Sequence, residues 1–447
     1  MVVQSRCCGI HTRGVATPSS PFLTFSSSSS SSSSSLSRPS IRYAVLGAGF
    51  AGLSVAWHLL RESTAEDLNL RIDIYDEIGI GGGASGISGG LLHPYSPKAK
   101  LLWRGAECWN ECLKLLGVAE AAEASMDSDQ LSSGISDFDT HFQGLIVRKR
   151  GILRPAVSMK NLLLISDNAR SCLSSCRIES LEKDAVQNLV PNLCLPLNKA
   201  FYMPEAVNIH PQRYVQALYI ACKNLAKELS ASGTGEKELH LHKKNINKLT
   251  DLEGEYQAVI ICVGAKADML PELAGRIPLR TCRGVVAHLK LSDDIGEEYP
   301  EAGPSILSDA WLAIQGPRSL YMGSTWEWKS RNSSPNVSAS ESSHALDELL
   351  PKACAIYPDL KKWSFAGARA GLRAMPPLTP HGSLPLLGCV NDIVGDNKGC
   401  KFWLFAGLGA RGLLYHAWLG KLMAQAVLAC NEQLIPSELT SWHKGTQ

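Results

Sequence analysis

The hydrophobic positions of the chain form a series of buried strands and apolar helices. An apolar run from Ile41 to Leu46 passes through a glycine-containing turn into an apolar, helix-compatible stretch from Leu53 to Leu60. A second strand is predicted over residues 70–77. The continuous apolar run over residues 256–263 is typical of a strand buried within a parallel sheet. This order of strands and helices predicts an α/β fold.

The rest of the chain adds further helices and a region of antiparallel strands. Apolar periodicity predicts helices over residues 100–116, 211–229 and 342–357. Pro211 opens the second of these helices, at a position that suits proline. Alternating apolar and polar positions between residues 284 and 328 predict antiparallel strands.

Three other segments complete the prediction. Residues 142–154 alternate in the manner of a β-hairpin, and residues 200–210 are predicted to be irregular. The chain closes with a strand over 401–405, a glycine-rich turn over 406–412 and a helix over 413–429.

These elements predict a Rossmann-like, doubly wound nucleotide-binding domain into which an antiparallel-sheet substrate domain is inserted. We assign the nucleotide-binding domain to residues 41–112, 205–275 and 366–440, and the substrate domain to residues 113–204 and 276–365.

The turn after the first strand has the G-x-G-x-x-G spacing of a dinucleotide-binding fingerprint. Gly47 permits the tight turn, Gly49 lets the backbone approach a pyrophosphate, and Gly52 lets the helix pack closely on the strand. Phe50 and Ala51 begin the helix, where unpaired N–H groups and the positive end of the helix dipole favour phosphates. The strand, turn and helix follow in the order that the fingerprint requires.

The second strand ends in acidic residues, at the place where dinucleotide-binding proteins hydrogen-bond a ribose hydroxyl. Asp76 is the preferred candidate because it lies at the strand end, and Glu77 is the alternative. The other interpretation of this region is a membrane span over the nearly uncharged residues 43–60. His58, the spaced glycines and the strand that follows oppose it. We therefore expect a nucleotide site and no stable membrane insertion.

A second glycine-rich segment runs from Gly79 to Leu92. Glycine occupies half of its positions, a density that destabilises both helix and strand. We predict a loop that lies against a cofactor, with contacts from Ala84, Ser85 and Gly86. Gly264, which closes the buried strand at 256–263, is predicted to contact the cofactor as well.

The turn before the last helix offers another set of backbone N–H groups. The helix dipole at this point can stabilise negative charge on a ligand. Arg411 either assists in this role or holds the turn in place. The predicted contacts are Gly407, Leu408, Gly409, Arg411 and Gly412.

The first forty residues differ in composition from the rest of the chain. They contain no Asp or Glu, three arginines, and an unbroken serine run from Ser26 to Ser35. This composition is typical of an organellar transit peptide, with a disordered tail as the alternative. The serine content favours a chloroplast over a mitochondrion as the destination.

Charge and cysteine content exclude several classes of function. The chain has 44 Lys and Arg against 42 Asp and Glu, a formal net charge of +2, so no global attraction to nucleic acid or anionic membranes is expected. Its fourteen cysteines form no C-x-x-C pair, which predicts neither a metal site nor a disulfide framework. Cys108 and Cys112, and likewise Cys172 and Cys176, are four apart and could share a helix face.

Four motifs recur in this order in one superfamily: the fingerprint at 47–52, residues 83–86, residues 259–265 and residues 407–412. On these motifs the chain resembles the FAD-dependent oxidoreductases of the D-amino-acid-oxidase type, which include glycine and sarcosine oxidases. The resemblance covers nearly all of residues 41–435. It implies the fold of that superfamily and FAD as the cofactor.

A narrower likeness concerns the FAD-dependent oxidoreductase domain of the bacterial bifunctional enzyme that makes 5-methylaminomethyl-2-thiouridine at the tRNA wobble position. The segments that carry it are Ala370–Ala374 (AGLRA), Leu384–Gly388 (LPLLG) and residues 405–413. That domain removes a carboxymethyl group from a wobble-base amine, so the resemblance implies a modified tRNA as substrate. The near-neutral charge of this chain departs from what an RNA substrate leads us to expect.

The resemblance also implies a role for one arginine. In this superfamily an arginine in a Gly-Leu-Arg context binds the substrate carboxylate, and the planar guanidinium suits that task because it can bind a carboxylate through two hydrogen bonds. Arg373 matches this context, and Arg369 is the alternative. A structural pairing of Arg373 with an acid is the other interpretation. The implied reaction transfers a hydride from the carbon next to nitrogen to flavin N5, and water hydrolyses the resulting imine.

Two other residues have open roles. His93 follows the glycine loop and could face the flavin or be structural. Sarcosine-oxidase-like enzymes carry a lysine that helps to activate oxygen, and Tyr321 falls near that position here.

Three functions follow from these features. The first is oxidation of the carboxymethylaminomethyl group of a tRNA wobble uridine, and the second is oxidation of free glycine, sarcosine or a related amino acid. The third is a flavoprotein that assists the assembly of an organellar complex. The sequence does not indicate an oligomeric state.

Overall fold

The computed structural model describes residues 40–63, 68–125, 146–233, 235–395 and 399–443. The predicted transit peptide over residues 1–40 lies outside these residues, apart from Ser40. The described residues belong to one compact unit.

A six-stranded, mostly parallel sheet forms the first layer of the fold. Its order is β19-β20-β10-β1-β2-β9, and every neighbouring pair is parallel except β19 with β20. The strands are β1 (Ser40–Leu46), β2 (Asn69–Tyr75), β9 (Lys237–His242), β10 (Ala258–Ile261), β19 (Leu386–Cys389) and β20 (Lys401–Ala406).

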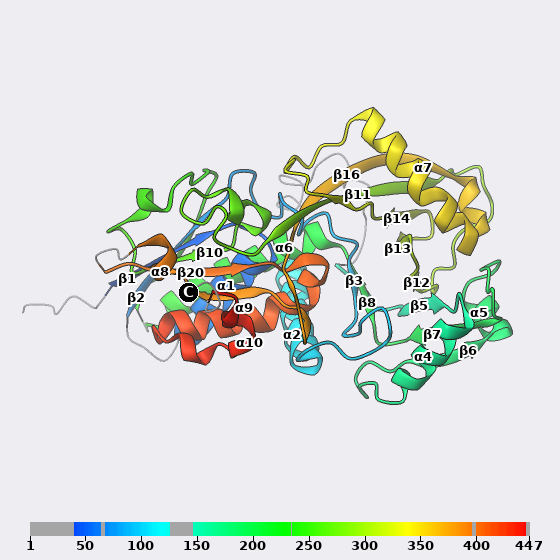
Figure 1. Ribbon diagram of the computed structural model, residues 1–447, viewed down its shortest axis with the longest axis horizontal. Helices are drawn as coiled ribbons and strands as arrows, with labels where there is room; N and C mark the ends of the chain where they lie inside the picture. The colour runs from blue at the N-terminus through cyan, green and yellow to red at the C-terminus, as the bar shows by residue number, and fades with distance from the viewer. Residues whose placement is uncertain (1–39, 64–67, 126–145, 234, 396–398, 444–447) are drawn as a thin grey trace, which may run out of the picture. The chain divides into compact units, whose positions relative to one another are not determined.

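Both faces of the parallel sheet are covered, which explains the continuous apolar runs in its central strands. Val45 belongs to a core shared with helices, whereas its neighbours Ala44 and Leu46 belong to a second core on the opposite face. Figure 1 shows the helices gathered along the sheet. The helices that pack together in the first core are α1 (Phe50–Glu62), α2 (Gly105–Ala124), α6 (Pro211–Ala231) and α9 (Gly412–Leu428).

The second layer is an antiparallel sheet in which β11 (Arg280–Leu291) pairs along its whole length with β16 (Trp363–Met375). Helix α7 (Ala339–Ile356) packs on this pair, as Figure 1 shows. One path of neighbours runs β15-β11-β14-β13-β12-β5-β7-β6. The remaining strands of this sheet are β5 (Ile152–Pro155), β6 (Glu179–Glu182), β7 (Lys199–Met203), β12 (Ser305–Ile306), β13 (Trp311–Gly316), β14 (Ser319–Gly323) and β15 (Glu327–Trp328).

A small third sheet joins β3 (Leu91–Leu92), β8 (Val207–Ile209) and β4 (Val147–Arg148). Two short strands, β17 (Leu378–Thr379) and β18 (Gly382–Ser383), pair with each other. The short helices outside the main layers are α4 (Met159–Ala169), α5 (Lys183–Leu189), α8 (Asn391–Val394) and α10 (Ser437–Thr440).

The predicted α/β fold with parallel and antiparallel layers is confirmed, but two local predictions are wrong. Residues 142–154 do not form a hairpin: in their described part, β4 pairs with β8 whereas β5 pairs with β7 and β12. Residues 200–210 are not irregular, because most of them lie in β7 and β8. In both cases the strand is defined by a partner distant in sequence, which local alternation does not reveal.

The predicted domain boundaries can be compared with the sheets. Residues 366–375, assigned to the nucleotide-binding domain, lie in β16 beside β11 of the antiparallel sheet. Residues 113–124, assigned to the substrate domain, lie in α2, which packs on α6 and α9. The division into two domains stays a prediction.

The apolar run over residues 43–60 is not a membrane span, because β1, the glycine turn and α1 share it. Among the described residues, no helix has both the length and the apolar character needed to cross a bilayer.

A buried carboxylate on β2 binds the neighbouring strand β9 and the segment that precedes β10. Asp73 on β2 is 1% exposed and accepts hydrogen bonds from Arg71 Nε at 3.0 Å, His242 Nε2 at 2.7 Å and Tyr256 Oη at 3.1 Å. Burial raises the pKa of Asp73, but the hydrogen bonds from Arg71, His242 and Tyr256 outweigh it and lower the pKa to about 2. The ionised form therefore stabilises the fold above pH ~4, and this stabilisation is lost as the pH falls toward 2.

We predict that Asp73→Asn lowers the free energy of unfolding by about 2 kcal/mol at pH 7, since each pKa unit is worth about 1.4 kcal/mol. The deficit should shrink steadily between pH 4 and pH 2. Urea unfolding at a series of pH values measures it. Glu238→Gln is the matched control, because this carboxylate is partly exposed and lies 3.7 Å from Arg71; it should cost less than about 1 kcal/mol. A deficit in Asp73→Asn that does not depend on pH would contradict this account.

Candidate active site

The turn at residues 47–52 leaves no room for a side chain at its glycines. Gly47 has a φ of +105°, and a Cβ there would lie 2.5 Å from the carbonyl oxygen of Cys262 on the neighbouring strand. A Cβ at Gly52 would lie 1.9 Å from the carbonyl oxygen of Gly47. The predicted roles of a tight turn and of close helix packing therefore have direct steric causes.

Two side chains from distant segments bind the backbone of this turn. The Asp76 carboxylate accepts a hydrogen bond from the Ala48 N–H of the turn at 2.8 Å, and also from the N–H groups of Ile78 at 3.0 Å and Gly79 at 2.8 Å just after Asp76 itself. The Ser85 hydroxyl accepts from the Phe50 N–H at 3.0 Å. Asp76 thus holds the turn as well as ending β2, and about one of its four acceptor sites remains for another donor.

Glu77, the alternative ribose ligand, points to a different partner. Its carboxylate pairs with Lys266 Nζ at 2.5 Å, and its side chain is half exposed. The structure therefore places Asp76, and not Glu77, against the glycine turn.

The first turn of α1 keeps free backbone donors. Its N-cap, Gly49, has no side chain to supply an acceptor. The N–H groups of Ala51 and Gly52 have no intrahelical partner by their position, and no other acceptor for them occurs in the described part of the chain. This is the arrangement that binds a phosphate group.

The glycine loop over residues 79–90 is held by the first turn of α6. Gln212 Nε2 donates to the carbonyl oxygen of Ile80 at 2.9 Å, and a Cβ at Gly86 would lie 2.0 Å from Gln212 Oε1. Trp311 of β13 lies against the same loop, because a Cβ at Gly89 would come within 2.6 Å of its ring. Neither Gln212 nor Trp311 was predicted from the sequence. Gln212 had a signal, since it lies beside Pro211 at a recognisable helix start.

The closing turn lies next to the first glycine turn. Gly407 and Gly409 have φ values of +74° and +54°, and a Cβ at Gly412 would lie 3.6 Å from the Phe50 ring. Leu408 is partly buried against the core that contains α1 and α9. The N-terminal ends of these two helices therefore meet, as expected if both contact one ligand.

Gly264 follows β10 on the same sheet. It has a φ of +58°, and no atom lies within 4 Å of where its Cβ would be. An open position of this kind lets a ligand approach the backbone closely.

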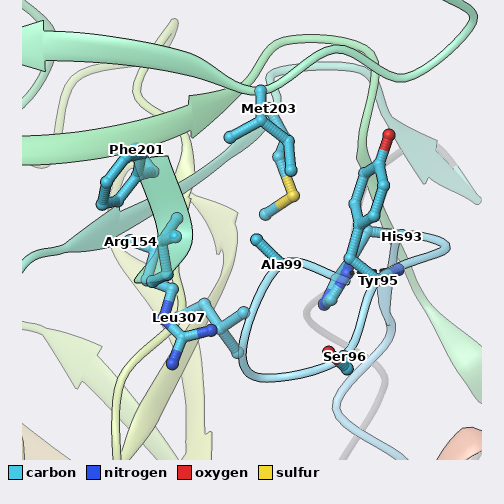
Figure 2. A pocket seen from close by; sticks show the side chains of 10 residues that line it. His93, Tyr95, Ser96, Ala99, Arg154, Phe201, Met203 and Leu307 are labelled. Carbon is cyan, nitrogen blue, oxygen red and sulfur yellow. Dashed lines mark hydrogen bonds between the residues drawn. The ribbon is translucent and has the colours of Figure 1, made fainter. Parts of the chain in front are cut away.

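Three basic side chains lie near one another beyond the glycine loop. The imidazole of His93 is buried, and burial, together with Arg411 and Arg154, lowers its pKa to about 3. Its Nδ1 accepts a hydrogen bond from the Tyr95 N–H at 3.3 Å. Figure 2 shows His93 and Tyr95 on one side of a small cavity, with Arg154 and Phe201 on the other. His93 is therefore neutral at physiological pH.

Arg411 keeps its guanidinium without a hydrogen bond or ion pair to any of the described residues. Burial lowers its pKa. An arginine in this state suits an anionic ligand better than the alternative role of holding the turn, because it makes no bond to the turn.

Arg373, the predicted substrate ligand, lies on β16 in the antiparallel sheet. Its Nη2 donates to the carbonyl oxygen of Thr325 at 2.7 Å, and its Nε lies 3.4 Å from the carbonyl oxygen of Cys282. No carboxylate among the described residues forms an ion pair with it. The alternative, a structural pairing with an acid, does not hold for these residues. Arg283 shows what such a pairing looks like, since it binds Glu341 at 2.7 Å.

The glycine loop and Arg373 lie on the same side of β16. A Cβ at Gly371 would lie 2.9 Å from Cα of Ala84 in the loop, so the strand and the loop touch there. Residues two apart in a strand face the same way, so Arg373 projects from the face that meets the loop. Gly284 on β11 makes room for its guanidinium, because a Cβ there would lie 2.2 Å from Nη2.

The other sequence candidates differ in their surroundings, and Tyr321 packs with Ile87 of the glycine loop. Tyr321 is on β14, with its ring 5.0 Å from that of His288. Cys108 and Cys112 are buried on α2, but Cys172 and Cys176 are not in a helix. The described residues contain no cluster of three or more His, Cys, Asp or Glu that could hold a metal ion.

The fold and the two glycine turns define a flavin-dependent oxidoreductase. The sequence profile of the FAD dependent oxidoreductases, the DAO family, matches residues 42–426. The chain belongs to this family, and the predicted FAD cofactor and oxidoreductase class are confirmed.

Individual relatives are more distant. A protein of Rhizobium etli, provisionally named thiamine biosynthesis oxidoreductase ThiO, is 25% identical over 248 residues, which are 55% of this chain and 59% of that protein. YurR of Bacillus subtilis, an uncharacterized oxidoreductase, is 29% identical over 178 residues, 40% of this chain and 44% of that protein. The chain thus matches only about half of the length of these curated relatives.

Solved structures of oxidases share the fold over nearly their whole length. Glycine oxidase from Geobacillus kaustophilus superimposes with a TM-score of 0.62 at 17% identity, covering 90% of this chain and 98% of that protein. Iminodiacetate oxidase from Chelativorans sp. BNC1 gives a TM-score of 0.60 at 19% identity, covering 89% and 98%. These likenesses concern the fold.

The residues present fit FAD. The open N–H groups of Ala51 and Gly52 suit the pyrophosphate, and the remaining acceptor site of Asp76 suits a ribose hydroxyl. The unpaired Arg411 suits an electron-rich edge of the flavin.

We predict that Asp76→Ala weakens FAD binding about 10-fold or more, because three backbone N–H groups lose their acceptor and the turn loosens. Titration of the apoprotein with FAD, followed by flavin fluorescence, measures the change. Glu77→Ala is the matched control, with less than a 3-fold effect, because its exposed ion pair contributes little. Loss of FAD in Glu77→Ala alone would assign the ribose to Glu77.

We predict that His93→Gln does not shift the pH dependence of flavin reduction between pH 5 and pH 9. With its pKa lowered to about 3, the imidazole carries no charge over this range. The measurement is the anaerobic rate of flavin reduction by an amine at a series of pH values. A shift in the acidic part of this pH–rate profile in the variant would show that His93 changes its protonation state during turnover.

Proposed function

We propose that this flavoprotein oxidises the C–N bond of an amine that carries a carboxylate. The observation that carries the proposal is Arg373, a guanidinium without a carboxylate partner among the described residues, on the face of β16 that meets the glycine loop at Ala84. Removing such a cation from water is costly unless an anion binds it. A substrate carboxylate supplies that anion.

Bound FAD supplies the ability to accept a hydride from the carbon next to the nitrogen. Arg373 orients the substrate by its carboxylate, which lowers the entropic cost of reaching the reactive geometry. The N-terminus of α9 and Arg411 would hold the flavin and stabilise the negative charge of its reduced form. His93 stays uncharged and so adds no charge of its own to their positive potential. The proposed mechanism requires no protein base if the amine binds in its neutral form.

We propose a carboxymethylaminomethyl group on a tRNA wobble uridine as the first candidate substrate. The motif likeness at residues 370–374 and 384–388 supports it. Free glycine, sarcosine or a related amino acid is the alternative, which the near-neutral charge supports. All of these compounds contain a carboxylate on a carbon that bears an amine, so the same arginine can bind each of them.

An assembly role without turnover remains the third candidate function. We propose the chloroplast as the compartment in which the protein acts.

Anaerobic mixing of the FAD-loaded protein with each amine tests the proposal. Loss of flavin absorbance with modified tRNA alone selects the first candidate. Loss with glycine or sarcosine selects the second. If no amine bleaches the flavin, the proposed oxidation is wrong and the assembly role gains support.

We predict that Arg373→Ala raises the half-saturating substrate concentration about 100-fold while FAD stays bound, because the carboxylate loses a charge-assisted bidentate partner. Arg373→Lys should recover part of this loss, since lysine keeps the charge but not the planar fork. Flavin reduction at varied substrate concentration, with FAD content measured by absorbance, gives both quantities.

Arg369→Ala is the matched control, because Arg369 lies four residues earlier on the same strand. Its effect on the half-saturating concentration should stay below about 5-fold. Loss of FAD from Arg373→Ala would show that Arg373 is structural, and a large effect only in Arg369→Ala would move the anchor to that residue.

A further inference from the structure

The face of the antiparallel sheet that carries Arg373 continues outward to two tryptophans. Cys282 on β11 pairs with Arg373 on one side and with Trp328 of β15 on the other. Directly paired residues in an antiparallel sheet project to the same face. A single row of side chains therefore leads from Arg373 across Cys282 to Trp328.

The tryptophans and two arginines form an aromatic ladder, which we define as Arg373, Trp326, Trp328 and Arg280. The Arg373 guanidinium lies 4.0 Å from the centre of the Trp326 ring, and the Arg280 guanidinium lies 5.2 Å from that of Trp328. The two indole rings stack with centres 5.9 Å apart and an angle of 27° between them.

The ladder is exposed although its rings are large and apolar. Trp326 and Trp328 are each 46% exposed, whereas tryptophan is highly buried on average. Exposed aromatic rings next to a functional residue are typical of a binding surface. Since the ring of Trp326 rests on the proposed carboxylate anchor, this surface begins where the substrate binds.

The charges around the ladder favour a polar, electron-rich ring over an aliphatic chain. Arg280 and Lys329 are cations within or beside it, and Glu327 is the acid between the two tryptophans. Arg331 nearby pairs with Asp268 at 3.5 Å. Stacking on tryptophan combined with arginine contacts is how proteins bind single nucleobases, whose flat faces suit both groups.

We propose that Trp326 and Trp328 form a stacking site for a planar aromatic ring, of the nucleobase class, that the amine substrate carries beyond its nitrogen. This inference rests on the proposed function, because it takes Arg373 as the carboxylate anchor. The carboxylate then binds Arg373 while the ring stacks on the tryptophans along the same row. Glycine and sarcosine have no ring and leave this surface uncovered.

The test compares one amine that has a ring with one that lacks it. The probes are 5-carboxymethylaminomethyluridine, as the free nucleoside and within an anticodon stem-loop RNA, and sarcosine. In the wild-type protein, the flavin should lose its absorbance at a lower concentration of the nucleoside than of sarcosine. Trp328→Ala should raise the half-saturating nucleoside concentration about 10-fold or more, the size of one lost stacking contact. Trp328→Phe should recover most of this loss, because phenylalanine keeps a flat face.

Phe365→Ala is the matched control, since Phe365 is a 43% exposed aromatic residue on the same strand as Arg373. It should leave the half-saturating nucleoside concentration within about 2-fold of wild type. Equal half-saturating concentrations of nucleoside and sarcosine in the wild type would overturn the stacking site. An unchanged half-saturating nucleoside concentration in Trp328→Ala would overturn it as well.

Tighter binding of the stem-loop than of the nucleoside would show that the ring comes from RNA. Equal binding would show that the free ring suffices.

Failure of the proposed oxidation can be told apart from failure of the stacking site. Quenching of tryptophan fluorescence by the nucleoside measures binding without turnover. If no amine bleaches the flavin but the nucleoside still binds and Trp328→Ala weakens that binding about 10-fold, the stacking site stands and the oxidation is wrong. Absence of nucleoside binding in the wild-type protein overturns the stacking site whatever the flavin does.

Discussion

The contact between Gly371 and Ala84 is the constraint on which the rest of the site depends. It joins β16 of the antiparallel sheet to the loop that borders the nucleotide-binding turn, with only 2.9 Å between Cα of Ala84 and the place of a Cβ at Gly371. Any larger residue at 371 would push the two layers apart. Because Arg373 is two residues further along β16, this one contact positions the proposed carboxylate anchor relative to the glycine loop.

The electrostatics of the site follow from arginines that lack acidic partners. Arg283, which has a structural role, is satisfied by Glu341 and by three backbone carbonyl groups. Arg373 and Arg411 have no such carboxylate among the described residues, and burial lowers the pKa of each. A protein tolerates a buried cation without an acidic partner where an anionic ligand binds it. FAD beside Arg411 and the proposed carboxylate substrate at Arg373 would be two anionic ligands of this kind.

Much of this could be predicted from the sequence because the signals are local. The glycine spacing at 47–52, the buried strand at 256–263 and Pro211 each reflect backbone geometry that a few neighbouring residues determine. The roles of Gly371, Gly284 and Gln212 could not be predicted in this way, because each depends on an atom from a segment more than a hundred residues away or on another strand. The same cause accounts for the missed strands at 199–209, which are stabilised by partners distant in the chain.

The pairing of Trp328, Cys282 and Arg373 could not be predicted either, since it depends on strand register. The sequence shows Trp326 and Trp328 as two aromatic residues two apart, and only the sheet shows that Trp328 lies in one row with Cys282 and Arg373.

A crystal structure of the FAD-loaded protein with a small carboxylate inhibitor, such as N,N-dimethylglycine, tests the central claim most directly. The account predicts that the inhibitor carboxylate binds both terminal nitrogens of Arg373, with its amine end toward the flavin ring. A carboxylate bound at Arg411 or elsewhere, with Arg373 still bonded only to Thr325, Cys282 and Ser324, would contradict it.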